Sequence, residues 1–259
     1  MLELMQVSKR FGGLAAVDQL SFNVPAGKIV GLIGPNGAGK TTLINMISGL
    51  DPVTEGQIFF KARDITHLKS HQISRLGIAR TYQNIRLFKM SVWENVIVGR
   101  HRSARSTLLE TLLMLPRQRR EEQAARTEAL TLLERLALTH VKTAEAPELS
   151  YGDQRRVEIA RALATEPEML LLDEPTAGMN AAETHKIGEL ILKLRDEGLT
   201  VLVIEHDMEL IGQVCDEVVA LNFGQLIAQG TPAEIKANPA VIEAYLGEEE
   251  EQLIPHRPK

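Results

Sequence analysis

A phosphate-binding loop is the clearest chemical feature of this sequence. It consists of Gly34, Pro35, Asn36, Gly37, Ala38, Gly39, Lys40, Thr41 and Thr42, follows the apolar run 29–33, and opens a helical pattern. The glycines let backbone N–H groups turn inward, the helix N-terminus adds a positive dipole, and Lys40 adds a charge. Thr41 is placed to bind Mg²⁺. These residues predict a site for a nucleoside triphosphate rather than a plain turn between strand and helix.

Two adjacent carboxylates, Asp173 and Glu174, follow the apolar run 169–172. Open α/β sheets bind ligands at the carboxyl ends of their strands, so we expect both side chains near the phosphate loop. Asp173 would hold Mg²⁺ through its water shell, and Glu174 would accept a proton from the water that attacks the γ-phosphate. The alternative is a solvated acidic turn, which the complete phosphate loop upstream disfavours.

His206 and Gln83 are further candidates. His206 follows a second apolar run, 201–204, and should reach the same sheet edge, where it would contact the γ-phosphate or the attacking water. A lone histidine is otherwise an ordinary polar group. Gln83 would bind Mg²⁺ and sense the γ-phosphate, or it would simply bond to a loop.

The segment 149–162 predicts a capped helix with Ser150 as N-cap and Asp153 as its partner. The Ser150 hydroxyl and the N–H groups near Gly152, at a helix N-terminus, also suit a γ-phosphate. Because the chain already has a complete phosphate loop, a second phosphate-directed helix end predicts a site shared between two subunits.

Composition and patterning define the elements that must position these residues. The 259 residues are 44% apolar and 4% aromatic, which suits one α/β core with an insertion, and the net charge of −5 argues against nucleic acid as a partner. The apolar runs 169–172 and 200–204 predict buried strands of a parallel sheet. Residues 91–164 are mainly helical in pattern, with an apolar stripe at Leu130, Leu133 and Leu136, whereas the acidic tail 248–259 predicts disorder.

The sequence has neither a signal-peptide pattern nor an apolar run of the ~20 residues that a membrane-spanning helix needs, so we expect a cytosolic chain that reaches a membrane through a partner. The lone Cys215 fits a reducing compartment.

The segment from Arg100 to Arg126 holds seven arginines against three glutamates. Its leucines Leu108, Leu112 and Leu115 would contact lipid or, more simply, pack on the helical insertion.

These motifs together resemble the nucleotide-binding subunit of ATP-binding cassette (ABC) transporters over nearly the whole chain. By this resemblance, residues 34–42 are the Walker A loop, Gln83 the Q-loop residue, residues 149–154 the signature, residues 170–174 the Walker B strand, and His206 the switch histidine. Phe11 sits where such subunits stack an aromatic ring on adenine, although it would also suit the core.

The resemblance implies an α/β fold of the P-loop NTPase type, with a mostly parallel sheet, an N-terminal antiparallel β subdomain and an inserted α-helical subdomain. It implies a single ABC ATPase domain over residues 1–247, with a core of residues 1–90 and 165–247 and the insertion at 91–164. Implied partners are ATP, Mg²⁺, a second ATPase subunit, two permeases and, indirectly, a substrate-binding protein. The chain would be a peripheral protein on the cytoplasmic face of the inner membrane.

The segments 82–88, 150–156 and 241–247 are similar to those of ATPase subunits of bacterial branched-chain amino-acid importers. Urea or amide importers and the lipopolysaccharide-export ATPase are alternatives, as is a soluble ABC ATPase that works without a permease. Tyr151, Asp153 and Asn180 depart from the wider family pattern. The first two leave Ser150 and Gly152 intact, and Asn180 keeps a helix cap but loses a charge.

Overall fold

The computed structural model describes residues 1–100 and 116–253, of which 116–122 and 247–253 are described by their backbone alone. A six-stranded sheet with the order β10-β9-β3-β8-β7-β6 forms the centre of the fold. Its strands are β3 (Ile29–Ile33), β6 (Ile78–Arg80), β7 (Met169–Asp173), β8 (Thr200–Ile204), β9 (Glu217–Asn222) and β10 (Gln225–Gly230). All neighbours are parallel except β9 and β10, which form a hairpin. The predicted mostly parallel core is confirmed.

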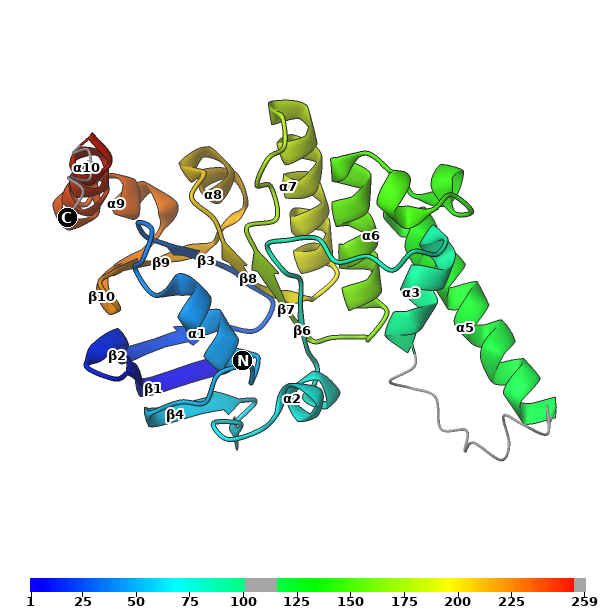
Figure 1. Ribbon diagram of the computed structural model, residues 1–259, viewed down its shortest axis with the longest axis horizontal. Coiled ribbons are helices and arrows are strands. Elements are labelled where there is room, and N and C mark those ends of the chain that lie inside the picture. The colour runs from blue at the N-terminus through cyan, green and yellow to red at the C-terminus, as the bar shows by residue number, and fades with distance from the viewer. Residues whose placement is uncertain (101–115, 254–259) are drawn as a thin grey trace, which may run out of the picture.

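A second, antiparallel sheet with the order β2-β1-β4-β5 comes mainly from the N-terminal part of the chain. It contains β1 (Leu2–Phe11), β2 (Leu14–Val24), β4 (Glu55–Phe60) and β5 (Arg63–Asp64). Helix α1 (Lys40–Ile47) lies between the two sheets (Figure 1) and buries Leu43, Ile44 and Ile47 there.

The central strands β3, β7 and β8 are almost entirely apolar because the sheet is covered on both faces. In β7, Leu170 and Leu172 pack into the helical side of the molecule, while Met169 and Leu171 pack toward α1 and the antiparallel sheet. Successive side chains of a strand point to opposite faces, so a strand buried on both sides cannot alternate apolar with polar residues.

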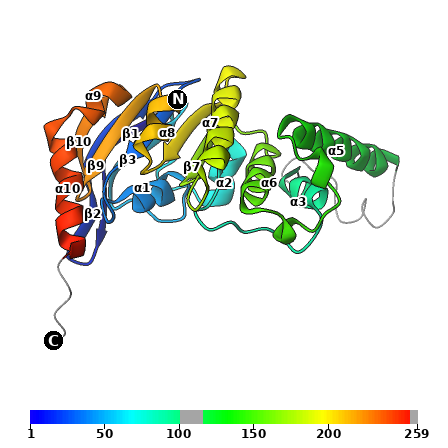
Figure 2. The ribbon, with the colours of Figure 1, turned by 90° about the horizontal axis from the view of Figure 1, so that it is seen from above.

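Helices cover the other face of the central sheet and extend beyond it. They are α3 (Val92–Arg100), α5 (Pro116–Arg135), α6 (Tyr151–Leu163), α7 (Ala181–Asp196), α8 (Met208–Val214), α9 (Pro232–Lys236) and α10 (Pro239–Leu253), with 3₁₀ turns η1 (Thr139–Val141) and η2 (Ala146–Glu148). Helix α2 (Ser70–Leu76) instead packs its Ile73 on the same side as α1 and the antiparallel sheet. Figures 1 and 2 place α3, α5 and α6 side by side at the end of the molecule farthest from α10. In α5, Leu133 is buried as its spacing predicts, but Leu130 is 37% exposed.

Helix α10 differs from the expectation for the tail. It continues past Glu248 to Leu253, where the composition predicts disorder. Glutamate is a good helix former, so the acidic run can extend a helix that packing has already started through Val241 and Tyr245. Residues 254–259 lie outside the described residues. In the described part of the chain, no helix combines the length and apolarity that crossing a bilayer requires.

Candidate functional site

Strands β3, β7 and β8 end at one edge of the central sheet, and each leads into a predicted site segment. Leu32 of β3 pairs with Ile204 of β8, which pairs with Asp173 of β7. Parallel strands share their direction, so their carboxyl ends meet at the same edge. The fold therefore gathers the phosphate loop, the two carboxylates and the residues after β8 at this edge.

The phosphate loop depends on glycine at two close approaches. Gly34 has φ +148, and a Cβ there would lie 2.2 Å from the Leu221 carbonyl oxygen. Gly39, directly before α1, has φ +98, and its Cβ would lie 2.4 Å from the Ala16 carbonyl oxygen. A side chain at either position would strain the backbone and push the neighbouring strand away.

Lys40 folds back over the loop that precedes it. Its Nζ donates to the carbonyl oxygens of Gly34, at 2.6 Å, and Pro35, at 2.9 Å, and the residue is only 8% exposed. A buried ammonium beneath a helix N-terminus concentrates positive charge at one point. Thr41 and Thr42 occupy the first turn of α1, where backbone N–H groups lack partners within the helix. The arrangement suits a phosphate chain.

Asp173 is held by an arginine that the sequence analysis did not single out. The Arg80 guanidinium donates through Nη2 to Asp173 Oδ2 at 2.9 Å and through Nη1 to Asn45 Oδ1 at 2.7 Å. Both side chains of this ion pair are less than a tenth exposed. Hydroxyl, carboxylate and amide oxygens are the ligands that Mg²⁺ takes, so Thr41, Asp173 and Gln83 have the donor types for that ion.

Glu174 and Gln83 contact each other. Gln83 Nε2 donates to Glu174 Oε2 at 2.8 Å, and the Glu174 N–H donates to the Ile204 carbonyl oxygen at 3.0 Å. Glu174 has φ 45, a left-handed conformation that is uncommon outside glycine and concentrates at functional sites. Gln83 therefore lies beside the carboxylate rather than bonding to a distant loop.

His206 follows β8 with an exposed side chain, 62% accessible, and its Nδ1 lies 3.8 Å from Glu205 Oε2. Glu205 itself is fully buried and accepts hydrogen bonds from the N–H and the hydroxyl of Thr176, at 2.9 and 2.6 Å. It ties the turn after Glu174 to the end of β8. Glu205 was not predicted from the sequence, although a carboxylate directly after the apolar run 201–204 is the signal that could have found it.

Ser150 caps α6 as predicted. Its Oγ accepts from the Asp153 N–H at 3.3 Å and donates to Asp153 Oδ2 at 3.0 Å. Gly152 is buried against α7, since a Cβ there would lie 3.1 Å from Glu183 Oε1. Both ribbon views place the start of α6 well apart from α1 (Figures 1 and 2), so one chain does not bring Ser150 to its own phosphate loop.

Two aromatic residues lie at opposite ends of the chain. Phe11 ends β1 and is 50% exposed, so its ring lies at the surface and not in the buried core. The Lys9 ammonium lies 4.8 Å from its ring centroid. Tyr245 of α10, which the sequence analysis did not single out, accepts the Gly34 N–H on its hydroxyl at 3.0 Å. The C-terminal helix thus contacts the first residue of the phosphate loop.

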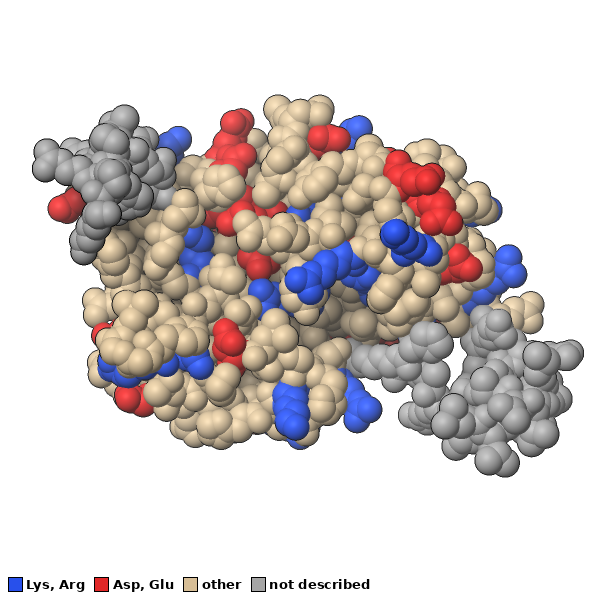
Figure 3. Space-filling model, in the orientation of Figure 1, with Lys and Arg blue, Asp and Glu red and all other residues tan. Residues whose placement is uncertain are grey.

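A groove of about 520 Å³ lies between α2, β6, α3 and α6. Its lining includes Leu50, Ile73, Tyr82, Arg86, Leu87, Phe88, Glu158 and Arg161. Figure 3 shows Lys and Arg side chains gathered over the segment that joins β6 to α3 on this face. Leu87 and Phe88 line the groove, whereas Trp93 packs in the helical group with Arg126 over its ring at 5.2 Å.

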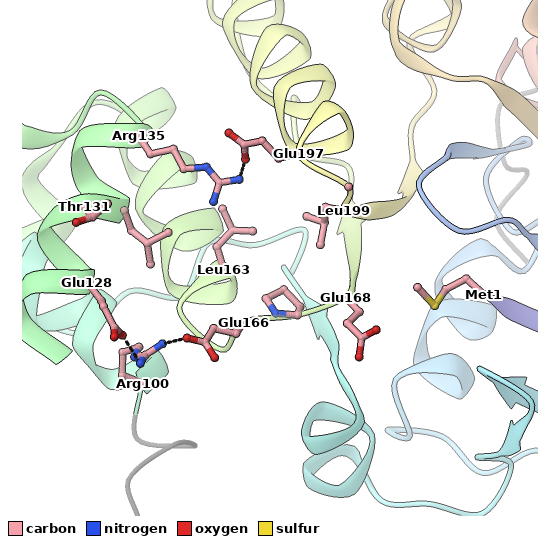
Figure 4. Close-up of a pocket in the computed structure, with 13 residues that line it drawn as sticks. Met1, Arg100, Glu128, Thr131, Arg135, Leu163, Glu166, Glu168, Glu197 and Leu199 are labelled. Atoms are coloured by element: carbon pink, nitrogen blue, oxygen red, sulfur yellow. Dashed lines mark hydrogen bonds and ion pairs between the residues drawn. The ribbon is translucent and has the colours of Figure 1, made fainter. Parts of the chain in front are cut away.

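A cavity of about 510 Å³ lies where the helical group meets the core (Figure 4). Arg100 pairs there with Glu128 and Glu166, and Arg135 pairs with Glu197. None of its lining residues is one of the candidate site residues above. Leu108, Leu112 and Leu115, for which lipid contact and packing on the helical insertion were the two alternatives, lie outside the described residues.

Comparison with known proteins matches residues 17–177 to the ABC transporter family and residues 225–251 to a branched-chain amino acid ATP-binding cassette transporter family. The chain is 47% identical to the high-affinity branched-chain amino acid transport ATP-binding protein LivG of Salmonella typhimurium, over 92% of this chain and 94% of that protein. It is 46% identical to BraF of Pseudomonas aeruginosa, which has the same description, over 95% and 98%.

Two solved structures show the same fold. The ADP conformation of MJ1267, an ATP-binding cassette of an ABC transporter, superposes with a TM-score of 0.84 at 35% identity, covering 95% of this chain and 98% of the other. A dimeric post-hydrolysis state of the cassette MJ0796, bound to ADP and phosphate, superposes with a TM-score of 0.76 at 27% identity, covering 90% and 99%.

Proposed function

The chain belongs to the ABC transporter family of ATP-hydrolysing proteins, and on that premise we propose that it powers a branched-chain amino-acid importer. The proposal depends on one combined observation. Lys40, Asp173 and Glu174 belong to segments that meet at one edge of the central sheet, and the same chain is 44–47% identical along nearly its whole length to proteins described for branched-chain amino-acid transport. The match of residues 225–251 to a branched-chain amino-acid family supports the same solute class.

In this proposal, ATP binds along the sheet edge. The loop 34–42 and Lys40 hold the β- and γ-phosphates, and Phe11 stacks on the adenine ring. Mg²⁺ would be held by Thr41, Asp173 and Gln83. When bound, it would neutralise charge on the phosphate oxygens. Glu174 accepts a proton from the attacking water, and His206 contacts the γ-phosphate or that water. The contact between Gln83 and Glu174 supports placing both at the reacting phosphate.

The active assembly is proposed to be a dimer of ATPase subunits, either two copies of this chain or this chain with a related subunit. Ser150 and Gly152 of one subunit complete the site formed by the other subunit's phosphate loop. The separation of the start of α6 from α1 within one chain supports this arrangement, as does the dimeric state of the MJ0796 cassette. ATP favours the closed dimer because only the closed form makes both sets of contacts.

Two permease subunits are the proposed membrane partners, with a substrate-binding protein delivering the solute to them. The groove beside Tyr82, Leu87 and Phe88 would receive a short permease helix, because it combines an apolar floor with the basic side chains of Arg86 and Arg161. The chain would therefore lie at the cytoplasmic face of the cell membrane. Its net charge of −5 gives no support for a nucleic-acid partner.

Replacing Glu174 by Gln tests the proposed chemistry. Glu174→Gln should bind Mg-ATP and accumulate as a closed dimer in size-exclusion chromatography, with phosphate release lost. Glu168→Gln, an exposed carboxylate paired with Lys61, is the matched control and should keep normal turnover. Wild-type phosphate release by Glu174→Gln would refute the assigned base. The solute class is tested in proteoliposomes with the permeases, where a leucine-loaded binding protein should stimulate turnover more than a urea-loaded one.

A further inference from the structure

Arg155 of α6 is the largest side chain in the described part of the molecule that is fully buried. It lies one turn after the Ser150 cap, in the helix that would complete the partner's ATP site. A guanidinium removed from water costs several kcal/mol unless its hydrogen bonds are replaced by protein groups. The groups that replace them show what this residue connects.

The two terminal nitrogens of Arg155 bind the backbone of the segment after β6. Nη1 donates to the Tyr82 carbonyl oxygen at 2.6 Å, and Nη2 donates to the Gln83 carbonyl oxygen at 2.8 Å. Nη2 also approaches the Glu174 carbonyl oxygen at 3.5 Å. One planar group thus spans the backbone of both residues whose side chains meet in the Gln83–Glu174 hydrogen bond.

A buried carboxylate completes the cluster. Glu158 Oε2 accepts from Arg155 Nη1 at 2.8 Å, and Glu158 Oε1 accepts from the Tyr82 N–H at 3.4 Å. Burial raises the pKa of Glu158, and the positive charge of Arg155 offsets only part of this rise. Tyr82 therefore has its N–H bound by Glu158 and its carbonyl bound by Arg155, and both Tyr82 and Glu158 line the groove.

We propose that Arg155 is a positioning residue that fixes Gln83 and Glu174 to helix α6, so that the proposed permease groove, the Ser150 cap and the hydrolytic carboxylate move as one unit. This inference rests on the proposed function, because it assigns Arg155 its effect through Gln83 and Glu174. A lysine cannot replace it, since one ammonium cannot span the two carbonyl oxygens that the guanidinium fork reaches.

The test compares Arg155→Lys with Arg195→Lys, a matched substitution in α7 at an arginine that pairs with Asp196 and Asp216. Arg155→Lys should remain folded and bind ATP with nearly unchanged affinity, while kcat falls roughly 10- to 100-fold, because displacing catalytic groups by about 1 Å costs that much. The Mg²⁺ concentration for half-maximal turnover should rise, and amide hydrogen exchange at residues 82–84 should accelerate. Arg195→Lys should change none of these.

A second variant keeps the test decisive if Arg155→Lys unfolds. Arg155→Met combined with Glu158→Gln removes both buried charges and should restore folding without restoring kcat or the protection of residues 82–84. Wild-type kcat and wild-type amide protection in either folded variant would overturn the inference. Turnover by Glu174→Gln would instead overturn the proposed function, so the two failures are distinguishable.

Discussion

Gly99 of α3 offers a sharp test of how the helical group is packed. A Cβ at Gly99 would lie 2.3 Å from the Arg161 carbonyl oxygen of α6, whereas an ordinary carbon–oxygen contact is about 3.3–3.6 Å. Gly99→Ala would therefore force α3 to retreat by about 1 Å. Overpacking of this kind costs about 1–3 kcal/mol, and the better helix propensity of alanine returns at most about 1 kcal/mol.

The expected net loss for Gly99→Ala is therefore up to about 2 kcal/mol, which lowers Tm by up to roughly 8 °C in a chain of this size. Gly212 of α8 is the control, because a Cβ there meets no atom within 4 Å. Gly212→Ala should raise Tm by roughly 1–4 °C from helix propensity alone. Thermal unfolding followed by the fluorescence of Trp93, the single tryptophan, measures both. A Gly99→Ala protein as stable as Gly212→Ala would refute the close packing of α3 on α6.

Three further outcomes are expected. Lys40→Met should weaken ATP binding roughly 10- to 100-fold in equilibrium dialysis, because it removes a charge-assisted contact to phosphate while keeping apolar volume; unchanged affinity would contradict that role. Asn180→Ala removes the cap of α7 and should cost about 1 kcal/mol in chemical denaturation, whereas Asn180→Asp should cost little. Burial opposes ionisation of Asp216, but hydrogen bonds from the Ile29 N–H and Lys28 outweigh it and lower its pKa. This stabilisation is present above pH ~4 and lost below it, so Asp216→Asn should lose stability at neutral pH and converge with the wild type in acid.

The parts of the site that follow local rules were predictable from the sequence. The phosphate loop, Asp173 and Glu174 each combine a motif with a buried strand, and the edge rule for parallel sheets then brings them together. The cap at Ser150 is likewise a short-range hydrogen bond. Such features need only neighbouring residues to form.

The parts that depend on distant partners were not predictable. Arg155 and Arg156 are adjacent in one helix, yet Arg155 is fully buried while Arg156 keeps 22% of its side chain exposed. The difference comes from the carbonyl oxygens of Tyr82 and Gln83, which accept hydrogen bonds from Arg155 and belong to the distant segment after β6. Arg80 and Glu205 were missed for the same reason, because helix or strand periodicity does not reveal which partner compensates a buried charge.

The hydrogen bond from the Gly34 N–H to Tyr245 joins residues 211 positions apart, and β3 pairs only with β8 and β9, which also come late in the chain. On the ribosome, the phosphate loop therefore emerges well before these neighbours, and it meets Tyr245 only after 211 further residues have been added. Chains that stop before β8 and α10 therefore lack these contacts to the phosphate loop, and we expect them not to compete with the folded subunit for ATP.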